Sequence, residues 1–326
     1  MTSAVLEALL DANVHHHAEY GHELSNHLPM ALVALHGLGA SEARLEAWAA
    51  GYRGRLAPAP LPVVWIGSEP WKDRFGTPDA WPAYRSLFAQ WLLHEGRDAV
   101  LAQVLPALMP GCGAAAFHGL IRSACALRAG HAGELTDGLA YWAWRYLPIE
   151  PAALDGREDD PGAVLDMLGS ALADTCSDAG LIADRMRDAA AQPAFGPIVA
   201  RLRVGDETLA ALTRVALTRY AEGGDFTVLH LVTACHAMHA LLPWLDEPLS
   251  ALRSFWAACA AGAASVRPRP APLALTVLPA WPEITARAIA SDDEHVIKLV
   301  WACTELDRLH GWEACRSAAA RAVVPG

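Results

Sequence analysis

Apolar residues recur every three or four positions along most of this chain, which is the spacing of one face of an α-helix. No segment alternates apolar and polar residues between Asn-Gly or Asp-Gly turns, as the strands of a β-hairpin would. The pattern therefore predicts an all-α protein. We expect one or two helices over residues 83–109 and a helical hairpin over residues 113–130 and 133–147. Further helices are expected over residues 41–53, 162–175, 195–223, 225–245, 249–265 and 292–311.

Two of the expected helix starts carry residues that satisfy the free backbone N–H groups of a first turn. Ser41 is suited to cap the helix that follows it. Ser25 or Asn26 would cap an earlier helix, and Pro29 would lie in the first turn of that helix.

Three proline-rich stretches interrupt the helical pattern, at residues 56–82, 147–161 and 266–282. The first contains six prolines and three tryptophans, so we expect it to pack on the protein, either as an ordered cover over a pocket or as a buried connection. The apolar, alanine-rich texture continues across all three stretches. Residues 1–326 are therefore predicted to form a single domain, a large irregular helical bundle with Pro/Trp-rich connecting segments.

Composition excludes several classes of protein. Of the 326 residues, 53% are hydrophobic and 19% are charged, which is too apolar for a disordered chain. No apolar run reaches the roughly 18–20 residues of a membrane-spanning helix. The net charge of −11 and the lack of a basic stripe make nucleic-acid binding a poor interpretation. The first residues carry acids where a signal peptide would be basic, so we expect a cytoplasmic protein.

The seven cysteines form an odd set with no C-x-x-C pair. This argues against a full disulfide framework and against a zinc ribbon. Several lie in apolar helical runs, where cysteine is usually a small buried hydrophobe, and this suits a reducing compartment.

Four of the 14 histidines lie at core-like positions in segments far apart in the sequence: His27, His118, His230 and His295. Helical bundles build metal sites from inward side chains on facing helices, so the four imidazoles are predicted to converge on one interior point. The alternative is that each is an ordinary half-buried histidine bonded to a carbonyl. His236 and His239 face a different side of their helix from His230 and are expected behind such a site or at the surface.

Lys298 is the most unusual residue, because the chain has only two lysines against 23 arginines. In the helix opened by Asp292 and Asp293, His295 and Lys298 lie on one face, and the rest of the helix is apolar too. An unpaired buried ammonium is costly, and its pKa falls toward the neutral amine. A lysine beside a carboxylate or reaching the surface remains the alternative, but arginine fills those roles elsewhere in this chain.

A primary amine has chemistry that arginine lacks. A protonated lysine has no lone pair for a metal, whereas N-carboxylation by CO2 would give Lys298 an oxygen ligand and a negative charge. Arg122 lies one turn beyond His118 and is a candidate catalytic residue, binding an anionic substrate or the carbamate. Its alternative role is to pair with a carboxylate at a helix end.

Five blocks, residues 25–41, 69–88, 111–127, 226–237 and 292–303, together resemble the questin oxidase-like family, whose fungal members act on anthraquinone-type polyketides. The resemblance implies oxygen-dependent ring cleavage or Baeyer–Villiger-type oxidation of a polycyclic aromatic, with NADPH as an external reductant. It also implies a non-haem iron centre held by histidines and a modified lysine. The matching residues here are His27, His118, His230, His295 and Lys298.

We therefore expect an Fe(II)- and O2-dependent mono- or dioxygenase that acts on an aromatic or quinone-like small molecule. Its pocket should be lined by some of the 12 tryptophans and by Phe117 or Phe226. Imidazole suits zinc, copper and nickel as well as iron, so the choice of iron rests on the resemblance. A zinc-dependent hydrolase and a non-catalytic helical ligand-binding scaffold are the competing interpretations.

Overall fold

The prediction of an all-α protein is confirmed. The computed structural model describes residues 3–64, 70–149, 156–175, 177–267 and 277–324, and sixteen α-helices lie in these ranges. The described strands are one short antiparallel pair, β1 (Glu19–Tyr20) and β2 (Leu24–Ser25), with Glu19 opposite Ser25.

The first eight α-helices and two 3-10 helices are α1 (Ala4–Asn13), α2 (Leu28–Gly37), α3 (Glu42–Arg53), η1 (Trp71–Arg74), α4 (Trp81–His94), α5 (Arg97–Leu108), η2 (Met109–Gly111), α6 (His118–Ala129), α7 (Ala132–Trp144) and α8 (Pro161–Ala171). The remaining helices are α9 (Ile182–Ala190), α10 (Phe195–Val199), α11 (Thr208–Gly223), α12 (Phe226–Leu241), η3 (Leu242–Trp244), α13 (Pro248–Ala264), α14 (Trp281–Ala290), α15 (Glu294–His310) and α16 (Glu313–Val323).

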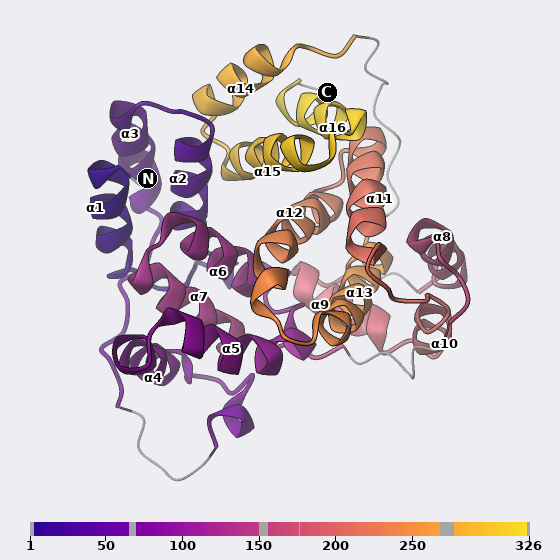
Figure 1. Cartoon of the computed structure of the whole chain (residues 1–326), viewed down its shortest axis with the longest axis horizontal. Coiled ribbons are helices and arrows are strands. Elements are labelled where there is room, and N and C mark those ends of the chain that lie inside the picture. The colour runs from indigo at the N-terminus through magenta and orange to yellow at the C-terminus, as the bar shows by residue number, and fades with distance from the viewer. Residues whose placement is uncertain (1–2, 65–69, 150–155, 176, 268–276, 325–326) are drawn as a thin grey trace.

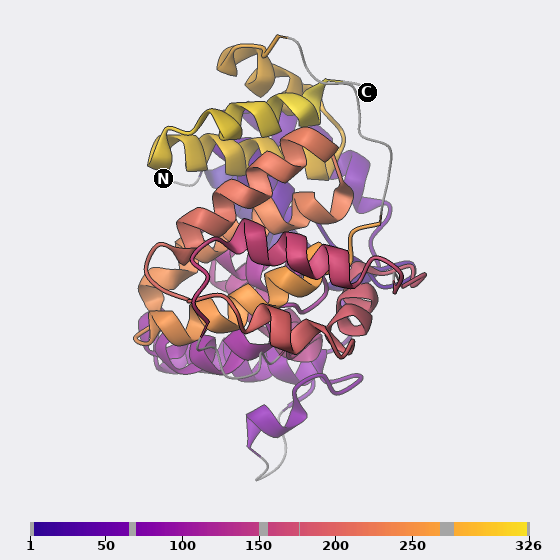
Figure 2. The same ribbon diagram turned by 90° about the vertical axis from the view of Figure 1, so that its right-hand side faces the viewer.

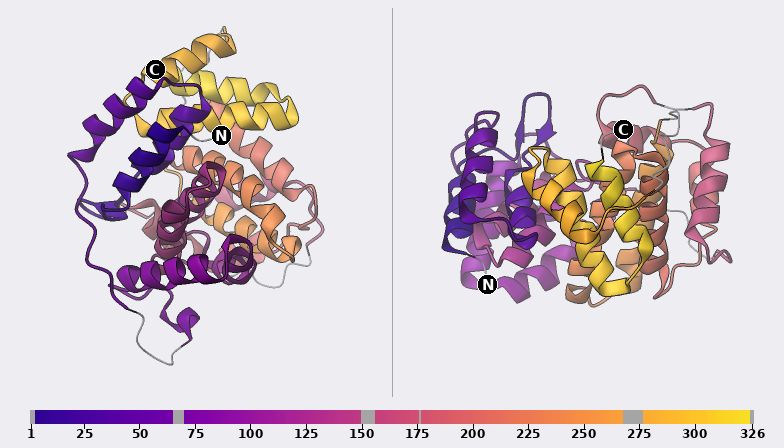
Figure 3. Two further views of the ribbon diagram at one scale, coloured as in Figure 1. Left: turned by 60° about the vertical axis from the view of Figure 1, so that its left-hand side comes forward. Right: turned by 90° about the horizontal axis from the view of Figure 1, so that it is seen from above.

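The two ends of the chain pack against each other. Helices α1–α3 form one side of the molecule and α8 and α10 the other, with α6, α12 and α15 between them (Figures 1 and 3). Helix α15 contacts both α2 and α12, and α6 contacts the same two helices. A continuous cluster of buried apolar side chains joins these elements. Four helices that are distant in sequence therefore meet in the interior.

Local sequence signals explain where several helices begin. The Ser41 hydroxyl accepts a hydrogen bond from the backbone N–H of Arg44, as a helix cap should. The side-chain oxygen of Asn26 accepts from the N–H of Leu28, and Pro29 lies in the first turn of α2. Residue Gly96 has φ of 82° and separates α4 from α5, so residues 83–109 form two helices.

The helix predicted over residues 195–223 is interrupted. Helix α10 ends at Val199, and residues 200–207 connect it to α11. Within this connection Leu202 forms a parallel bridge with Glu158, and the N–H of Arg203 donates to the Glu158 carbonyl. Hydrogen bonds to another segment replace the helical hydrogen bonds here. The spacing of apolar residues along the chain does not encode such long-range bonds.

The proline-rich segment 56–82 is described except for residues 65–69. The ring of Trp71 contacts Phe88 and Trp91 of α4, and Phe75 stacks on Tyr146 with ring centroids 4.4 Å apart. In Figure 2 the short helix η1, which carries Trp71, lies at the lower edge of the molecule, at the opposite end from α14. Parts of the other two proline-rich stretches, residues 150–155 and 268–276, lie outside the described residues.

The expectation that no apolar run is long enough for a membrane-spanning helix is wrong, because α12 together with η3 is long and apolar enough by length and composition. In the window Phe226–Trp244, 72% of residues are buried inside the fold, which is how the core helix of a bundle passes the same test. The six described cysteines are buried and free of disulfides, as the sequence predicted.

Helices α6 and α7 approach each other closely at Gly119, which lies against Trp142. A Cβ atom added there would lie 2.6 Å from both Cα and Cβ of Trp142.

We expect Gly119→Ala to lower the free energy of unfolding by about 1–3 kcal/mol, because the two helices must separate. Urea unfolding measures this. Gly51→Ala is the control: it is also in a helix, but nothing lies within 4 Å of the added atom. The control should be up to about 1 kcal/mol more stable, and equal effects at the two glycines would refute the packing explanation.

Candidate metal centre

The four sequence-predicted histidines all lie at the amino-terminal ends of helices. His27 is the residue that precedes α2, and His118 is the first residue of α6. His230 lies in the second turn of α12, and His295 is the second residue of α15. The meeting of these four helix starts brings together side chains that are up to 268 positions apart in sequence.

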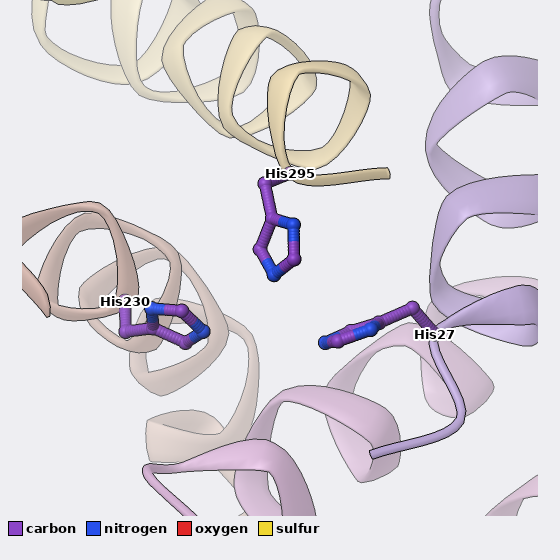
Figure 4. Close-up of side chains that lie close together, drawn as sticks. All are labelled: His27, His230 and His295. Atoms are coloured by element: carbon purple, nitrogen blue, oxygen red, sulfur yellow. The ribbon is translucent and has the colours of Figure 1, made fainter. Parts of the chain in front are cut away.

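The imidazole rings form one cluster. Neighbouring ring centroids are 4.7 Å apart for His27 and His118, 4.7 Å for His27 and His295, 5.0 Å for His118 and His230, and 5.5 Å for His230 and His295. One ligand nitrogen from each of His27, His230 and His295 lies within 4.8 Å of the other two. Figure 4 shows these three side chains pointing toward one another from three separate helices.

Backbone carbonyls fix the orientation of two of the rings. The Nδ1–H of His118 donates to the Ala115 carbonyl, and that of His230 donates to the Phe226 carbonyl at 2.8 Å. In a neutral imidazole the other nitrogen then carries a lone pair. Both rings therefore present Nε2 as an electron-pair donor.

Carboxylates face the outer nitrogens of the other two rings. Nδ1 of His27 lies 3.6 Å from Oε1 of Glu294, and Nδ1 of His295 lies 3.4 Å from Oδ1 of Asp293. Nε2 of His295 and Nδ1 of His27 are buried and have no hydrogen-bond partner among the described residues. His295 therefore shows the pattern of metal-binding histidines, in which an acceptor faces the outer N–H and the inner nitrogen faces the ion.

The closest contact in the cluster joins two inner nitrogens. Nε2 of His27 lies 2.7 Å from Nε2 of His118. Two lone pairs at that distance repel, so one nitrogen must carry a proton or both must face a cation. If His27 carried its proton on Nε2, its Nδ1 would have a lone pair facing the Glu294 carboxylate. The other tautomer, with the proton on Nδ1, places an N–H there instead. The donor set therefore fits a bound metal cation.

The environment keeps these imidazoles neutral. Burial lowers the pKa of His27, His118 and His230 well below 6.5, and the nearby Lys298 charge lowers them further. Burial and Lys298 also lower the pKa of His295, although Asp293 opposes this. Neutral imidazoles are the form that binds a metal.

Lys298 is buried next to this cluster and its side chain is 3% exposed. Burial lowers its pKa to about 8, while the Glu294 charge acts in the opposite direction. Its ammonium form acts electrostatically on all four histidines. The side chain lines a small cavity with His236 and does not line the large cavity described below.

Arg122 does not reach the cluster's cavity. Its guanidinium is fully buried in an ion-pair network, with Nε donating to Oε2 of Glu134 at 2.9 Å and Nη2 donating to Oδ2 of Asp137 at 3.0 Å. Two carboxylates thus hold the group that was expected to bind a substrate or a carbamate. Arg122 belongs to the framework of the fold, which is its alternative interpretation.

That network supports the start of α2. The Asn13 amide donates to Oε1 of Glu134 at 2.7 Å, and the Asn26 amide donates to Oδ1 of Asn13 at 3.1 Å. Asn26 in turn accepts from the N–H of Leu28. A chain of buried hydrogen bonds therefore holds the turn that carries His27.

A cavity of about 270 Å³ opens over the histidines. Its lining residues are Glu19, Tyr20, Glu23, Leu24, Ser25, His27, Ala115, Ala116, His118, Arg145, Leu147, Gly180, Leu181, Ile182, Ala183, Asp184, Arg187, Phe226, His230, Glu294 and His295. Phe226 lines it, as expected, and its ring lies 4.8 Å from His230 and 4.7 Å from His295. The expectation of tryptophans is wrong for the described lining, and Phe117 packs on Phe255 instead. No described residue of the segment 56–82 lines this cavity.

A polar group that sequence reasoning missed forms one wall of the cavity. Arg145 makes a two-armed ion pair with Glu19 and also donates to Oε1 of Glu23 at 2.9 Å. The Tyr141 hydroxyl donates to Glu19 at 2.9 Å and accepts from Ser25 at 2.7 Å. The pairing of Glu19 with Arg145, 126 positions away, has no local signal in the sequence.

The carbonyl that holds His118 belongs to a strained segment. Ala115, Ala116 and Phe117 have φ of 46°, 55° and 69°, in the left-handed region that disfavours side chains. Such strain persists only where the surroundings impose it, and it is concentrated at functional sites. Here it brings the Ala115 carbonyl under the imidazole and starts α6 at the cavity floor.

A family model described as questin oxidase-like matches residues 24–303, which include all four histidines and Lys298. No curated protein matches the chain.

The buried cluster predicts how stability depends on pH. Below about pH 6.5 the unfolded chain binds protons that the folded apoprotein cannot, because burial lowers the pKa of His27, His118 and His230. The free energy of unfolding should therefore fall as the pH drops, by about 1.4 kcal/mol per pH unit for each such histidine. Lys298 is protonated in both states in this range and adds no slope.

Urea unfolding of the metal-free protein between about pH 7.5 and 5 measures the slope. His230→Gln removes one of the titrating groups and should make the slope shallower by about one proton. A stability that stays constant over this range would contradict the neutral, buried cluster.

Proposed function

The chain belongs to the questin oxidase-like family, and on this premise we propose that it is an iron- and O2-dependent oxidoreductase acting on an aromatic, polyketide-type small molecule. Family membership indicates an oxidoreductase of polyketide-type substrates. The observation that carries the finer proposal is a cluster of four buried imidazoles at the floor of a cavity, three of which bring a ring nitrogen within 4.8 Å of one another.

The donor set fits a ferrous ion. His27, His118, His230 and His295 would hold it through Nε2, with the Asp293 carboxylate facing the outer N–H of His295 and the Glu294 carboxylate 3.6 Å from Nδ1 of His27. Bound iron would supply the one-electron chemistry that lets a closed-shell organic molecule react with O2.

The residues of the cavity do the binding and orientation. Leu181 and Ile182 on one side and Phe226 on another give a planar aromatic molecule apolar contacts above the imidazoles. The Glu19–Arg145 pair offers hydrogen-bond partners for phenolic hydroxyl or quinone oxygens at the wall of the cavity. A bound aromatic would exclude water from the histidine floor and hold its reactive ring above it.

We propose further that Lys298 is N-carboxylated and supplies an anionic oxygen ligand. Its ammonium form raises the positive potential at all four histidines, which opposes cation binding. A carbamate reverses the sign of that charge. Arg122, held by Glu134 and Asp137, takes no part in this proposal.

The cytoplasm is the proposed location, in keeping with the six free, buried cysteines. NADPH is the proposed external reductant where the reaction inserts a single oxygen atom. The chain carries no G-x-G-x-x-G motif after a strand that would bind it permanently.

Metal analysis and oxygen uptake test the proposal directly. Protein purified without a histidine tag and reconstituted with ferrous iron should bind close to one iron per chain and consume O2 with a panel of hydroxyanthraquinones, measured with and without NADPH. His295→Ala should reduce bound iron below about a tenth per chain, because one of four imidazole ligands is lost. His239→Ala is the matched control, since His239 is half-buried against Thr213 and His310 and lies outside the cluster.

Two other outcomes of the metal analysis would contradict the iron proposal. A colourless, zinc-loaded protein that consumes no O2 would favour the hydrolase. Less than about a tenth of any metal per chain after reconstitution would leave a ligand-binding scaffold and overturn the iron proposal.

Substitution of Lys298 tests the carbamate. Lys298→Arg keeps the formal charge but cannot be carboxylated, so iron content and activity should both be lost. Lys298→Ala should regain part of both when a small carboxylic acid is added. An active Lys298→Arg variant would refute a role for this residue in metal binding.

A further inference from the structure

The large cavity above the histidines is lined by more acidic than basic side chains. Four carboxylates face two guanidiniums in its described lining: Glu19, Glu23, Asp184, Glu294, Arg145 and Arg187. The formal charge of this set is −2, and the four imidazoles add nothing because burial keeps them neutral. Lys298 does not line the cavity, and its ammonium would still leave the sum negative. The lining therefore carries an excess of negative charge.

Arg145 is already occupied by two carboxylates. Its Nε and Nη2 donate to the two oxygens of Glu19, and Nη2 also donates to Oε1 of Glu23 at 2.9 Å. The guanidinium lies over the ring of Trp144, 4.2 Å from the ring centroid. An anionic ligand would have to displace a carboxylate that is held by charge-assisted hydrogen bonds. Arg145 with its two acids thus presents a net charge of −1 to the cavity.

The two acids differ in their access to solvent. The side chain of Glu19 is 7% exposed and also accepts a hydrogen bond from the Tyr141 hydroxyl, whereas that of Glu23 is 54% exposed. Glu19 lies in β1 and Glu23 directly precedes β2, so the short hairpin brings both to the same arginine. Glu23 can therefore be replaced without disturbing the buried part of the network.

The second arginine of the lining does not offset this charge. Arg187 pairs with Asp184 at 2.6 Å, three positions earlier on α9. Their side chains are 59% and 43% exposed. The pair has no net charge, so the excess of acid remains with Glu19, Glu23 and Glu294.

The size of the cavity makes this charge important. An apolar cavity of about 150 Å³ holds one benzene molecule, so about 270 Å³ accommodates an aromatic of two or three fused rings with little space left for water. A carboxylate carried into it on such a ring would lose its hydration, which is costly without a cationic partner. Both arginines of the described lining already have acidic partners.

We propose that Glu19 and Glu23 determine the specificity of the cavity, which accepts uncharged hydroxylated aromatics and rejects aromatic carboxylates. A phenolic or alcoholic hydroxyl donates a hydrogen bond to a carboxylate oxygen, whereas a ligand carboxylate has no proton to donate and is repelled. The inference rests on the aromatic substrate of the proposed function. It adds which members of that class are excluded and which residues exclude them.

Equilibrium binding to the full-length chain tests the inference without using activity. The probes are 1,8-dihydroxy-3-(hydroxymethyl)anthraquinone and the corresponding 3-carboxylic acid, which differ in one substituent. Chelator keeps the protein metal-free, so that the acid cannot bind to a metal instead. At pH 7 and low ionic strength, quenching of tryptophan fluorescence should show the acid binding at least about tenfold more weakly. The difference should shrink in 0.5 M salt, because screening reduces the repulsion.

Glu23→Gln identifies the residue responsible. The amide keeps the size of the side chain and an oxygen acceptor for Arg145 but removes the charge. The acid should bind about three- to tenfold more tightly to this variant, and the hydroxymethyl compound about as before. Glu46→Gln is the matched control, since Glu46 is an exposed residue of α3 outside the cavity lining. An equal effect of Glu46→Gln would assign the selectivity to the overall charge of the protein and overturn the inference.

Three further outcomes would also overturn it. Equal affinities of wild-type protein for the two probes would show that the acids of the wall do not discriminate. Tighter binding of the acid that is lost in Arg187→Gln would show that this exposed arginine recruits anions. Binding of neither probe would remove the aromatic substrate of the proposed function as well, whereas a failure of iron binding or oxygen uptake alone would leave the selectivity intact.

Discussion

The contact of 2.7 Å between the inner nitrogens of His27 and His118 is the constraint on which the rest of this structure depends. It exists only because the starts of α2 and α6 are held within one side-chain length of each other, with α12 and α15 completing the ring of imidazoles. Each of these starts has its own support. Buried hydrogen bonds from Asn13 and Asn26 hold the first, and the left-handed turn before α6 holds the second.

Much of this could be predicted from the sequence, because the relevant information is local. Helical spacing, helix caps such as Ser41 and the placing of histidines in apolar segments depend on neighbours a few positions away. The rarity of lysine singled out Lys298 for a similar reason, since it is a property of composition. The buried environment of Lys298 is then a consequence of the apolar helix in which it lies.

The remainder depends on partners far away in the chain. Arg122 shares a helix with His118, yet its environment is set by Glu134 and Asp137 on the next helix, and no spacing rule distinguishes a substrate-binding arginine from a buried structural one. The tryptophans expected in the cavity are used in packing elsewhere, as Trp142 is against Gly119. Glu294 directly precedes His295, so its place beside that histidine can be read from the sequence. Its proximity to His27 arises only when α2 and α15 pack together.

The amino-terminal position of all four histidines has one more consequence. The backbone N–H groups at a helix start carry partial positive charge, and α6 begins without a side-chain cap to offset it. This partial charge adds to burial in disfavouring a second proton on the imidazole of His118, which is the first residue of that helix. The start of the helix itself therefore helps to keep the Nε2 lone pair of His118 available to a ligand.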